Sequence, residues 1–409
     1  MSKRSIGGDS SFTSHKRHAA APQDESPLPS ATSSLALQAS SSSIPKIPLD
    51  LIADLILPFV ADRATWNSMY CASKYLCLAG KKMTPPWPNT TPNFGQAVRL
   101  VVFSPSGSQL ALVYNRVNTH QDVVHVWDRW GKEALLAGRT RVMHCLEYSW
   151  DGEYLASGCQ DGSIRLWNTE SFHAASSKIS RGTPTQEPSQ ADTIMVGSGH
   201  NFVMTLSFSR TDSNILASGG SNGEIKLWNV KEQACIHSFD PRRGVIRALT
   251  FAGGVCMAVT NTRSIIRLWR AEGSSDFTSE IIGQAAPPGS AIFSPSGSFL
   301  ATCIISYTEI SSTLALYELG NMTKSQSVVM PGVQAMCFAV SPDSKQLVVG
   351  DYRGRIRLVQ TDDFSIQRAL DIRGTSSMSN AAVLSASFDP TCRVLAFGCS
   401  DGTVELRTL

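Results

Sequence analysis

The sequence predicts a mainly β fold made of seven similar units, and three observations lead to this prediction. A turn of the type aromatic-Ser-Pro-x-Gly recurs, as in residues 103–107 and 293–297. Its seven copies begin at residues 103, 148, 208, 251, 293, 340 and 388. A strand rich in small residues and then a second strand follow these turns, with apolar and polar residues in alternation. Units of about 45 residues with several short strands are typical of the blades of a β-propeller.

The residues within each unit agree with this prediction. In the turn, proline presets φ at the second position and glycine accepts a positive φ at the end. The small-residue strands are LASG (155–158), LASGG (216–220), LATC (300–303), LVVG (347–350) and LAFG (395–398). The strands that follow them are IRLWN (164–168), IKLWN (225–229), IRLWR (266–270), LALYE (314–318) and IRLVQ (356–360). Gly, Ala and Ser suit a crowded face that packs on the next sheet.

Two different segments precede the repeats. Residues 1–43 contain 13 serines and Phe12 as their single aromatic residue, so they cannot bury enough apolar area to fold, and we expect a disordered tail. Residues 44–88 carry apolar residues at helical spacing, interrupted by prolines, and predict three short helices. So short a helical segment needs a surface to pack on, either in this chain or in a partner.

The helical segment resembles an F-box. The similarity lies in IPLDLIADLILPFV (47–60) and YCASKYL (70–76). The resemblance implies that the segment docks a Skp-type adaptor of a cullin ubiquitin ligase. The docking residues would be Ile47, Pro48, Leu49, Leu51, Ile52, Leu55 and Ile56. The alternative is a structural cap that packs on the following domain.

The repeats at 97–409 resemble a seven-bladed WD-repeat propeller. In such repeats four residues form a hydrogen-bonded tetrad: a His, a Ser or Thr, an Asp and a Trp. The third unit matches it with His200, Ser218 and Trp228, and has Asn222 in place of Asp. The second unit has Ser157, Asp161 and Trp167, with Thr140 where His would stand. The Trp-Asp pair itself occurs at Trp127-Asp128. The resemblance also places a closing strand for the last sheet near residues 87–91.

The second unit is followed by an insertion at 171–190, rich in Ser, Thr, Pro and Gln, which falls between its third and fourth strands. We expect a disordered loop there.

The composition narrows the classes of function. The net charge of +3 excludes a strongly basic nucleic-acid coat, and no apolar stretch is long enough to span a membrane. The ten cysteines form no CxxC pair, and no motif of a hydrolase, nucleotide-binding or zinc enzyme occurs. We therefore expect no enzymatic activity, metal or cofactor, and a location in the cytoplasm, the nucleus or both. Nucleic acid and small-molecule substrates are not expected as partners.

Basic residues gather in the loops that resemble the partner-binding face of WD-repeat proteins. They are Arg99, Arg139, Arg141, His144, Arg242, Arg243, Arg247, Arg263 and Arg353. Arginine forms paired, charge-assisted bonds with carboxylates and phosphates. The sequence thus suggests a site for an acidic or phosphorylated partner, with the fourth unit contributing most. The alternative is an ordinary scatter of solvated arginines.

Two functions fit these features. The first is the substrate-recognition adaptor of a Skp–cullin–F-box ubiquitin ligase. The second is a WD-repeat scaffold in another multiprotein complex, in chromatin, RNA processing or trafficking, with the helical segment as a cap.

Overall fold

The computed structural model describes Trp87 and most of residues 93–409. Its gaps there are 116–120, 130–132, 138–141, 173–192, 196–198, 240–243, 253–254, 263–264, 272–277, 285–287, 307–309, 321–323 and 372–380. The chain divides into two compact units, Met1–Ile47 and Pro48–Leu409, and all that follows concerns the second. The predicted tail, the F-box-like helices and their seven docking residues lie outside the described residues.

The first four sheets each contain four strands. The first sheet consists of β1 (Val98–Phe103), β2 (Gln109–Asn115), β3 (Asp122–Asp128) and β4 (Glu133–Ala137). The second consists of β5 (Met143–Tyr148), β6 (Tyr154–Cys159), β7 (Ile164–Asn168) and β8 (Thr193–Met195). The third consists of β9 (Val203–Phe208), β10 (Ile215–Gly220), β11 (Ile225–Asn229) and β12 (Ala234–Phe239). The fourth consists of β13 (Val245–Ala252), β14 (Val255–Thr262), β15 (Ile265–Ala271) and β16 (Thr278–Gln284).

Three more sheets follow. The fifth consists of β17 (Pro288–Phe293), β18 (Phe299–Ser306), β19 (Ser311–Glu318) and β20 (Lys324–Pro331). The sixth consists of β21 (Ala335–Val340), β22 (Gln346–Asp351), β23 (Arg355–Gln360) and β24 (Ile366–Asp371). The seventh has three strands in the described part of the chain, β25 (Val383–Phe388), β26 (Val394–Cys399) and β27 (Val404–Thr408).

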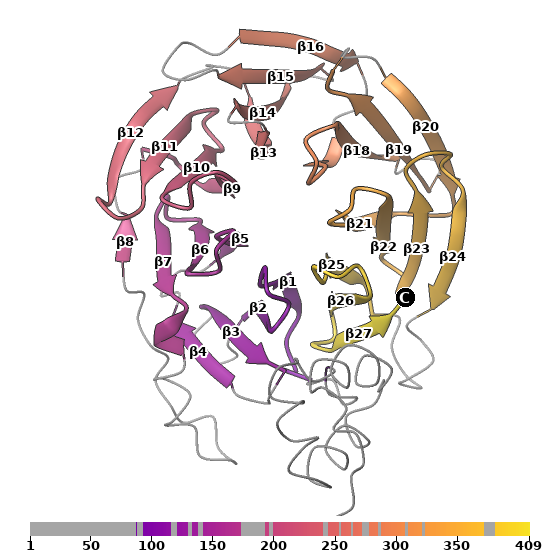
Figure 1. The fold of residues 1–409 in the computed structure, drawn as a ribbon. Helices are drawn as coiled ribbons and strands as arrows, with labels where there is room; N and C mark the ends of the chain where they lie inside the picture. The colour runs from indigo at the N-terminus through magenta and orange to yellow at the C-terminus, as the bar shows by residue number, and fades with distance from the viewer. Residues whose placement is uncertain are drawn as a thin grey trace, which may run out of the picture. The chain divides into compact units, whose positions relative to one another are not determined.

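The sheets succeed one another in chain order, and every pair of neighbouring strands in them is antiparallel. The first strand of each sheet packs beside the first strand of the next, and β25 packs beside β1. Figure 1 shows these inner strands nearest the centre and the fourth strands farthest from it. This arrangement supports the predicted β-propeller.

The recurring turns confirm the sequence prediction. Each joins an inner strand to the second strand of its sheet, and Gly107 donates its N–H to the carbonyl of Ser104 at 2.8 Å. Gly107, with φ of 65°, has the left-handed conformation that favours glycine. In the sixth and seventh sheets this place in the turn is taken by Ser344 and Cys392, also with positive φ.

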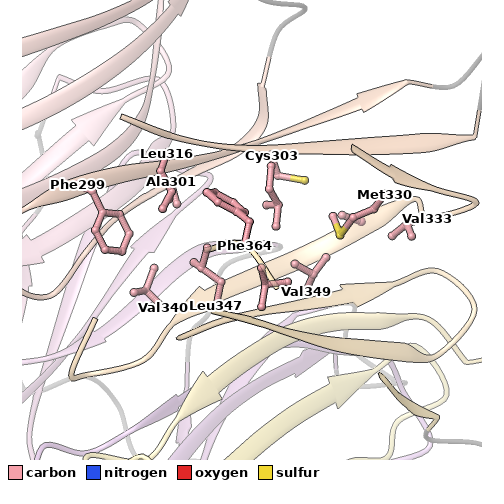
Figure 2. Packing of buried hydrophobic residues seen from close by; sticks show 13 residues of the cluster. Phe299, Ala301, Cys303, Leu316, Met330, Val333, Val340, Leu347, Val349 and Phe364 are labelled. Carbon is pink, nitrogen blue, oxygen red and sulfur yellow. The ribbon is translucent and has the colours of Figure 1, made fainter. Parts of the chain in front are cut away.

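Side chains between neighbouring sheets form the core. Between the fifth and sixth sheets, Phe299, Leu316 and Met330 pack against Leu347 and Val349, as Figure 2 shows. Similar clusters fill the other spaces between adjacent sheets. Each sheet therefore depends on its neighbours for burial of its apolar faces.

The predicted tetrad of the third sheet is present. The Ser218 hydroxyl lies 2.9 Å from Nε2 of His200 and accepts the Trp228 indole N–H at 2.8 Å. Asn222 lies 3.4 Å from the other ring nitrogen of His200, the place that Asp holds in the resemblance. Burial lowers the pKa of His200, which favours the neutral ring within this network.

The same network is not seen in the described part of the second sheet. The buried Trp167 indole N–H has no hydrogen-bond partner in the described part of the chain, and Ser157 lies 3.7 Å from the Cys159 sulfur instead. The sequence places Thr140, which lies outside the described residues, where the resemblance expects the histidine of the tetrad.

The segment before β1 is fastened where the first and last sheets meet. Trp87 is 6% exposed and packs with residues of both sheets, among them Phe103, Trp127 and Val404. Asn93 forms an isolated bridge with Thr403. The segment before β1 is thus paired with the residue that immediately precedes β27. Because residues 88–92 lie outside the described residues, the closing strand near 87–91 stays a prediction.

The insertion in the second unit lies between β7 and β8, as predicted. The first residues of the insertion are ordered, unlike the expected disordered loop. Phe172 is buried in the cluster between the first and second sheets, and the Ser171 hydroxyl donates a hydrogen bond to the carbonyl of Asn168 at 2.6 Å. An aromatic side chain next to the sheet gains more from burial than from solvation, so it holds this end of the insertion in place.

Candidate functional site

A β-bulge interrupts every inner strand near its beginning, and these bulges define the candidate site. In each strand one residue is skipped by the pairing with the second strand, as between Val98 and Leu100. The skipped residues are Arg99, His144, Met204, Arg247, Gly289, Met336 and Leu384. A bulge leaves its residue out of the ladder and redirects its side chain. We call this end of the inner strands the bulge end, and the opposite end, with the recurring turns, the turn end.

The first bulge residue is held by an ion pair. The Arg99 guanidinium contacts the carboxylate of Asp122, which is fully buried and also accepts the Met143 N–H at 2.6 Å. Burial raises the pKa of Asp122, although the Met143 N–H and the Arg99 charge favour its ionised form. Arg99 is therefore oriented by the fold, and part of its charge is already balanced.

His144 contributes an aromatic ring to the bulge end. Burial and the nearby Arg99 charge lower the pKa of His144, so the ring is neutral at pH 7. Its ring centroid lies 6.0 Å from that of Phe202, which is 40% exposed. This pair forms an apolar surface beside the ion pair of Arg99.

Among the described residues of the site, Arg247 is the most available cation. Its side chain is exposed, and it makes no hydrogen bond or ion pair with any described residue. Met336, on the inner strand β21, is 47% exposed. The bulge end therefore offers an exposed guanidinium together with exposed apolar side chains, which suits a partner that is both acidic and apolar.

Arg353 also lies at the bulge end, in the turn after β22. Its backbone N–H donates to the buried Asp351 at 2.9 Å, and its guanidinium donates to the Tyr352 hydroxyl at 2.5 Å. The Asp351 carboxylate further pairs with Arg357 at 3.5 Å. Asp351 is thus a structural residue of the turn and not a free acid on the surface.

The structure brings four of the nine predicted residues to one end of the inner strands: Arg99, His144, Arg247 and Arg353. The other five predicted residues lie outside the described residues: Arg139, Arg141, Arg242, Arg243 and Arg263. Their role in the site stays a prediction.

Sequence reasoning missed the apolar members, Phe202, Met204, Met336 and Leu384. A signal for three of them was present, because every bulge residue stands four positions before the residue that begins its recurring turn, as Met336 stands before Val340. Phe202 has no such signal, because it belongs to the loop before β9.

A cavity of about 480 Å³ runs along the inner strands. His144 and Arg247 line it toward the bulge end, and Trp150 and Arg210 line it toward the turn end. Between them lies Glu147, half-buried, whose carboxylate accepts the Phe208 N–H at 3.2 Å. We call this the central cavity. Its size falls within the range of ligand sites, about 300–1,000 Å³.

Burial raises the pKa of Glu147 to about 8, although the Phe208 N–H and the Arg210 charge favour ionisation. Between the ordinary pKa of 4.5 and this value the folded chain binds more protons than the unfolded chain. The contribution of the Glu147 carboxyl to the free energy of unfolding is fully present below the ordinary pKa, and it is lost as the pH rises through 8. We expect the ionisation of Glu147 to lower the free energy of unfolding by about 1–2 kcal/mol between about pH 5 and 9. This value allows for screening by water, because the side chain is only half-buried.

Denaturant unfolding of the Glu147→Gln variant over this pH range measures that contribution. The variant keeps an acceptor for Phe208 and loses the titration, so its stability should change less with pH than that of the wild type. The exposed Glu153→Gln variant is the control and should follow the wild type. Parallel curves for wild type and Glu147→Gln would contradict the assignment.

Other chemistry is not seen in the described part of the chain. No group of three His, Cys, Asp or Glu side chains there could hold a metal ion. No helix among the described residues has the length and apolar character to cross a membrane.

Comparison with known proteins agrees with the repeat architecture. Residues 134–168 and 192–229 match the family model "WD domain, G-beta repeat". These matches cover most of the second and third sheets, which also carry the most complete tetrad residues. The matches and the strand-rich fold together support a WD-repeat β-propeller.

Three relatives show the breadth of the similarity. Pre-mRNA-processing factor 19 homolog 2 of Arabidopsis thaliana is 27% identical over 147 residues, 36% of this chain and 27% of the relative. Periodic tryptophan protein 2 of the same plant is 23% identical over 287 residues, which are 68% of this chain and 29% of the relative. The U3 small nucleolar RNA-associated protein 15 homolog of Xenopus laevis is 20% identical over 292 residues, which are 69% of this chain and 50% of the relative. The chain thus spans half or less of the length of these relatives.

Proposed function

We propose that the chain is a non-catalytic WD-repeat scaffold that holds a protein partner at the bulge end, within a multiprotein assembly of RNA processing. The observation that carries this proposal is the ring of bulge residues, which places oriented basic and apolar side chains at one end of seven packed inner strands. The names of the relatives, with pre-mRNA processing and nucleolar RNA among them, favour this type of assembly. The match of two segments to the WD-repeat family model agrees with a binding role.

The ubiquitin-ligase hypothesis has less support. None of the three relatives described above is named as a ligase adaptor, and the F-box-like residues lie outside the described residues. The scaffold hypothesis rests on the described part of the chain, so we prefer it.

The bulge end combines two kinds of recognition. Arg247 provides a guanidinium without a partner among the described residues, and such a group binds carboxylate or phosphate through two parallel hydrogen bonds. Met336 and Phe202 provide apolar area that a partner would bury. A partner segment with acidic and apolar residues side by side would satisfy both, whereas a nucleic acid would leave the apolar residues uncovered.

Affinity capture with quantitative mass spectrometry tests the proposal. The tagged wild-type chain and its Arg247→Glu variant are compared in nuclear extract. We expect the variant to capture at least tenfold less of each partner protein. This is about the effect of losing one charge-assisted pair and replacing it by a repulsion. Lys231→Glu, an equally exposed charge reversal between β11 and β12, is the control and should keep them.

Two outcomes would contradict the proposal. Partners retained by both Arg247→Glu and the double variant Arg247→Glu/Met336→Glu would exclude the bulge end as the binding surface. Recovery of a Skp-type adaptor, lost on deletion of residues 44–86, would restore the ligase hypothesis.

A further inference from the structure

An exposed aromatic side chain and an arginine meet at the turn end of the central cavity. Trp150, in the turn between β5 and β6, is 44% exposed. Arg210, which follows β9 in the next sheet, places its guanidinium carbon 4.0 Å from the centre of the Trp150 ring. Both residues line the central cavity. Tryptophan is enriched among the residues that dominate binding at interfaces, so an exposed tryptophan beside a cavity is a candidate anchor for a partner.

Stacking orients Arg210 but leaves its hydrogen-bonding edge available. The side chain makes no hydrogen bond or ion pair with any described residue. A guanidinium over an indole face is attracted to the ring, and its N–H groups remain able to donate hydrogen bonds. Such a group is prepared to bind a carboxylate, because little side-chain entropy remains to be lost.

The acidic residues of the same two turns are occupied. Asp151 accepts hydrogen bonds from the Ser149 hydroxyl at 2.6 Å and from the Glu153 N–H at 3.0 Å. Asp212 accepts from the backbone and side-chain amides of Asn214 at 2.9 and 3.0 Å. Both carboxylates thus hold their own turns, and neither forms an ion pair with Arg210 in the described part of the chain.

We propose that Trp150 and Arg210 form a second docking site, for an extended segment of a partner protein that carries a carboxylate next to a large apolar side chain. The carboxylate binds the free edge of Arg210, and the apolar side chain covers the exposed face of Trp150. A peptide fits better than a nucleic acid, because Asp151 and Asp212 would repel a chain with a charge on every unit.

This site is distinct from the bulge end. The two lie at opposite ends of the inner strands, and a six-residue strand such as β9 spans about 20 Å. A chain with both sites holds two partners at once without either covering the other. The turn-end site therefore adds a bridging role that does not depend on the identity of the partner at the bulge end.

Fluorine NMR of the chain labelled with 5-fluorotryptophan tests this site directly. The sequence has eight tryptophans, and the Trp150→Phe variant assigns the signal of Trp150. The probe is a capped synthetic peptide of alternating glutamate and phenylalanine, and a lysine–phenylalanine peptide of equal length is the control. We expect the acidic peptide to shift the Trp150 signal and the basic peptide to leave it in place.

Variants separate the two ends of the molecule. Arg210→Gln should weaken binding of the acidic peptide at the Trp150 signal at least tenfold, and Arg210→Lys should weaken it less. Arg210 is exposed, and circular dichroism verifies that the Arg210→Gln and Arg210→Lys variants fold. Arg247→Glu should leave the Trp150 titration unchanged, so failure of the bulge-end proposal and failure of this one are distinguishable.

Three results would overturn the proposal. The first is no shift of the Trp150 signal at millimolar acidic peptide in the folded wild type. The second is an equal shift with the basic peptide. The third is tighter binding of single-stranded oligouridylate at the same signal, which would make the stacked pair a nucleic-acid site.

Discussion

Replacing Trp87 by alanine is expected to lower the free energy of unfolding by about 3–5 kcal/mol, the usual cost of removing a buried tryptophan. The indole lies against the Phe103 and Trp127 rings at 5.6 and 5.5 Å, and Arg129 lies over it at 5.3 Å. Its cluster includes residues of both the first and the last sheet. Its loss would therefore weaken the contact between these two sheets as well as leave a cavity.

Thermal or denaturant unfolding measures this effect, and Trp150→Ala serves as the matched control. Trp150 is exposed, so its removal should cost less than about 1 kcal/mol. Similar losses for both variants would show that Trp87 does not anchor the two sheets.

The Ser218→Ala variant is expected to lose about 2–4 kcal/mol of stability. Ser218 is completely buried and is the hub of the tetrad, bonded to both His200 and Trp228. Alanine would leave the indole N–H and a ring nitrogen buried without this partner, and each such group costs about 1–3 kcal/mol. The volume removed is small, so the loss would come from hydrogen bonding.

Ser157→Ala is the natural control, because Ser157 has the same place in the second sheet and is equally buried. It supports no tetrad, and the Trp167 indole is already without a partner in the described part of the chain. Chemical denaturation of the two variants should give a cost below about 1 kcal/mol for Ser157→Ala. Equal costs would mean that the tetrad does not stabilise its sheet beyond packing.

The repeat could be predicted from the sequence because its turns obey local rules. Proline and glycine restrict φ at the turn positions, and the alternation beside them fixes which face of each strand is buried. The inner strands β1 and β5 end at the anchor residues Phe103 and Tyr148. The tetrad could be predicted as well, because its residues keep a fixed spacing along the repeat.

The site was harder to predict because it depends on contacts between distant residues. Arginines could be counted, but the sequence does not reveal that Arg99 is paired with Asp122 whereas Arg247 has no described partner. Nor does it reveal that His144 is neutral, because burial by other strands sets its pKa. The cation–π pair of Trp150 and Arg210 joins neighbouring sheets and has no pattern along the chain.

The bulges have a consequence for how binding specificity changes in evolution. Since the residue at each bulge takes no part in the ladder, its side chain can be exchanged without disturbing the hydrogen bonds on either side. The chain already has Arg, His, Met, Gly and Leu at these equivalent positions. A duplicated copy of such a gene could therefore acquire a new partner through a few substitutions at these seven places, while selection on the rest of the strands keeps the fold unchanged.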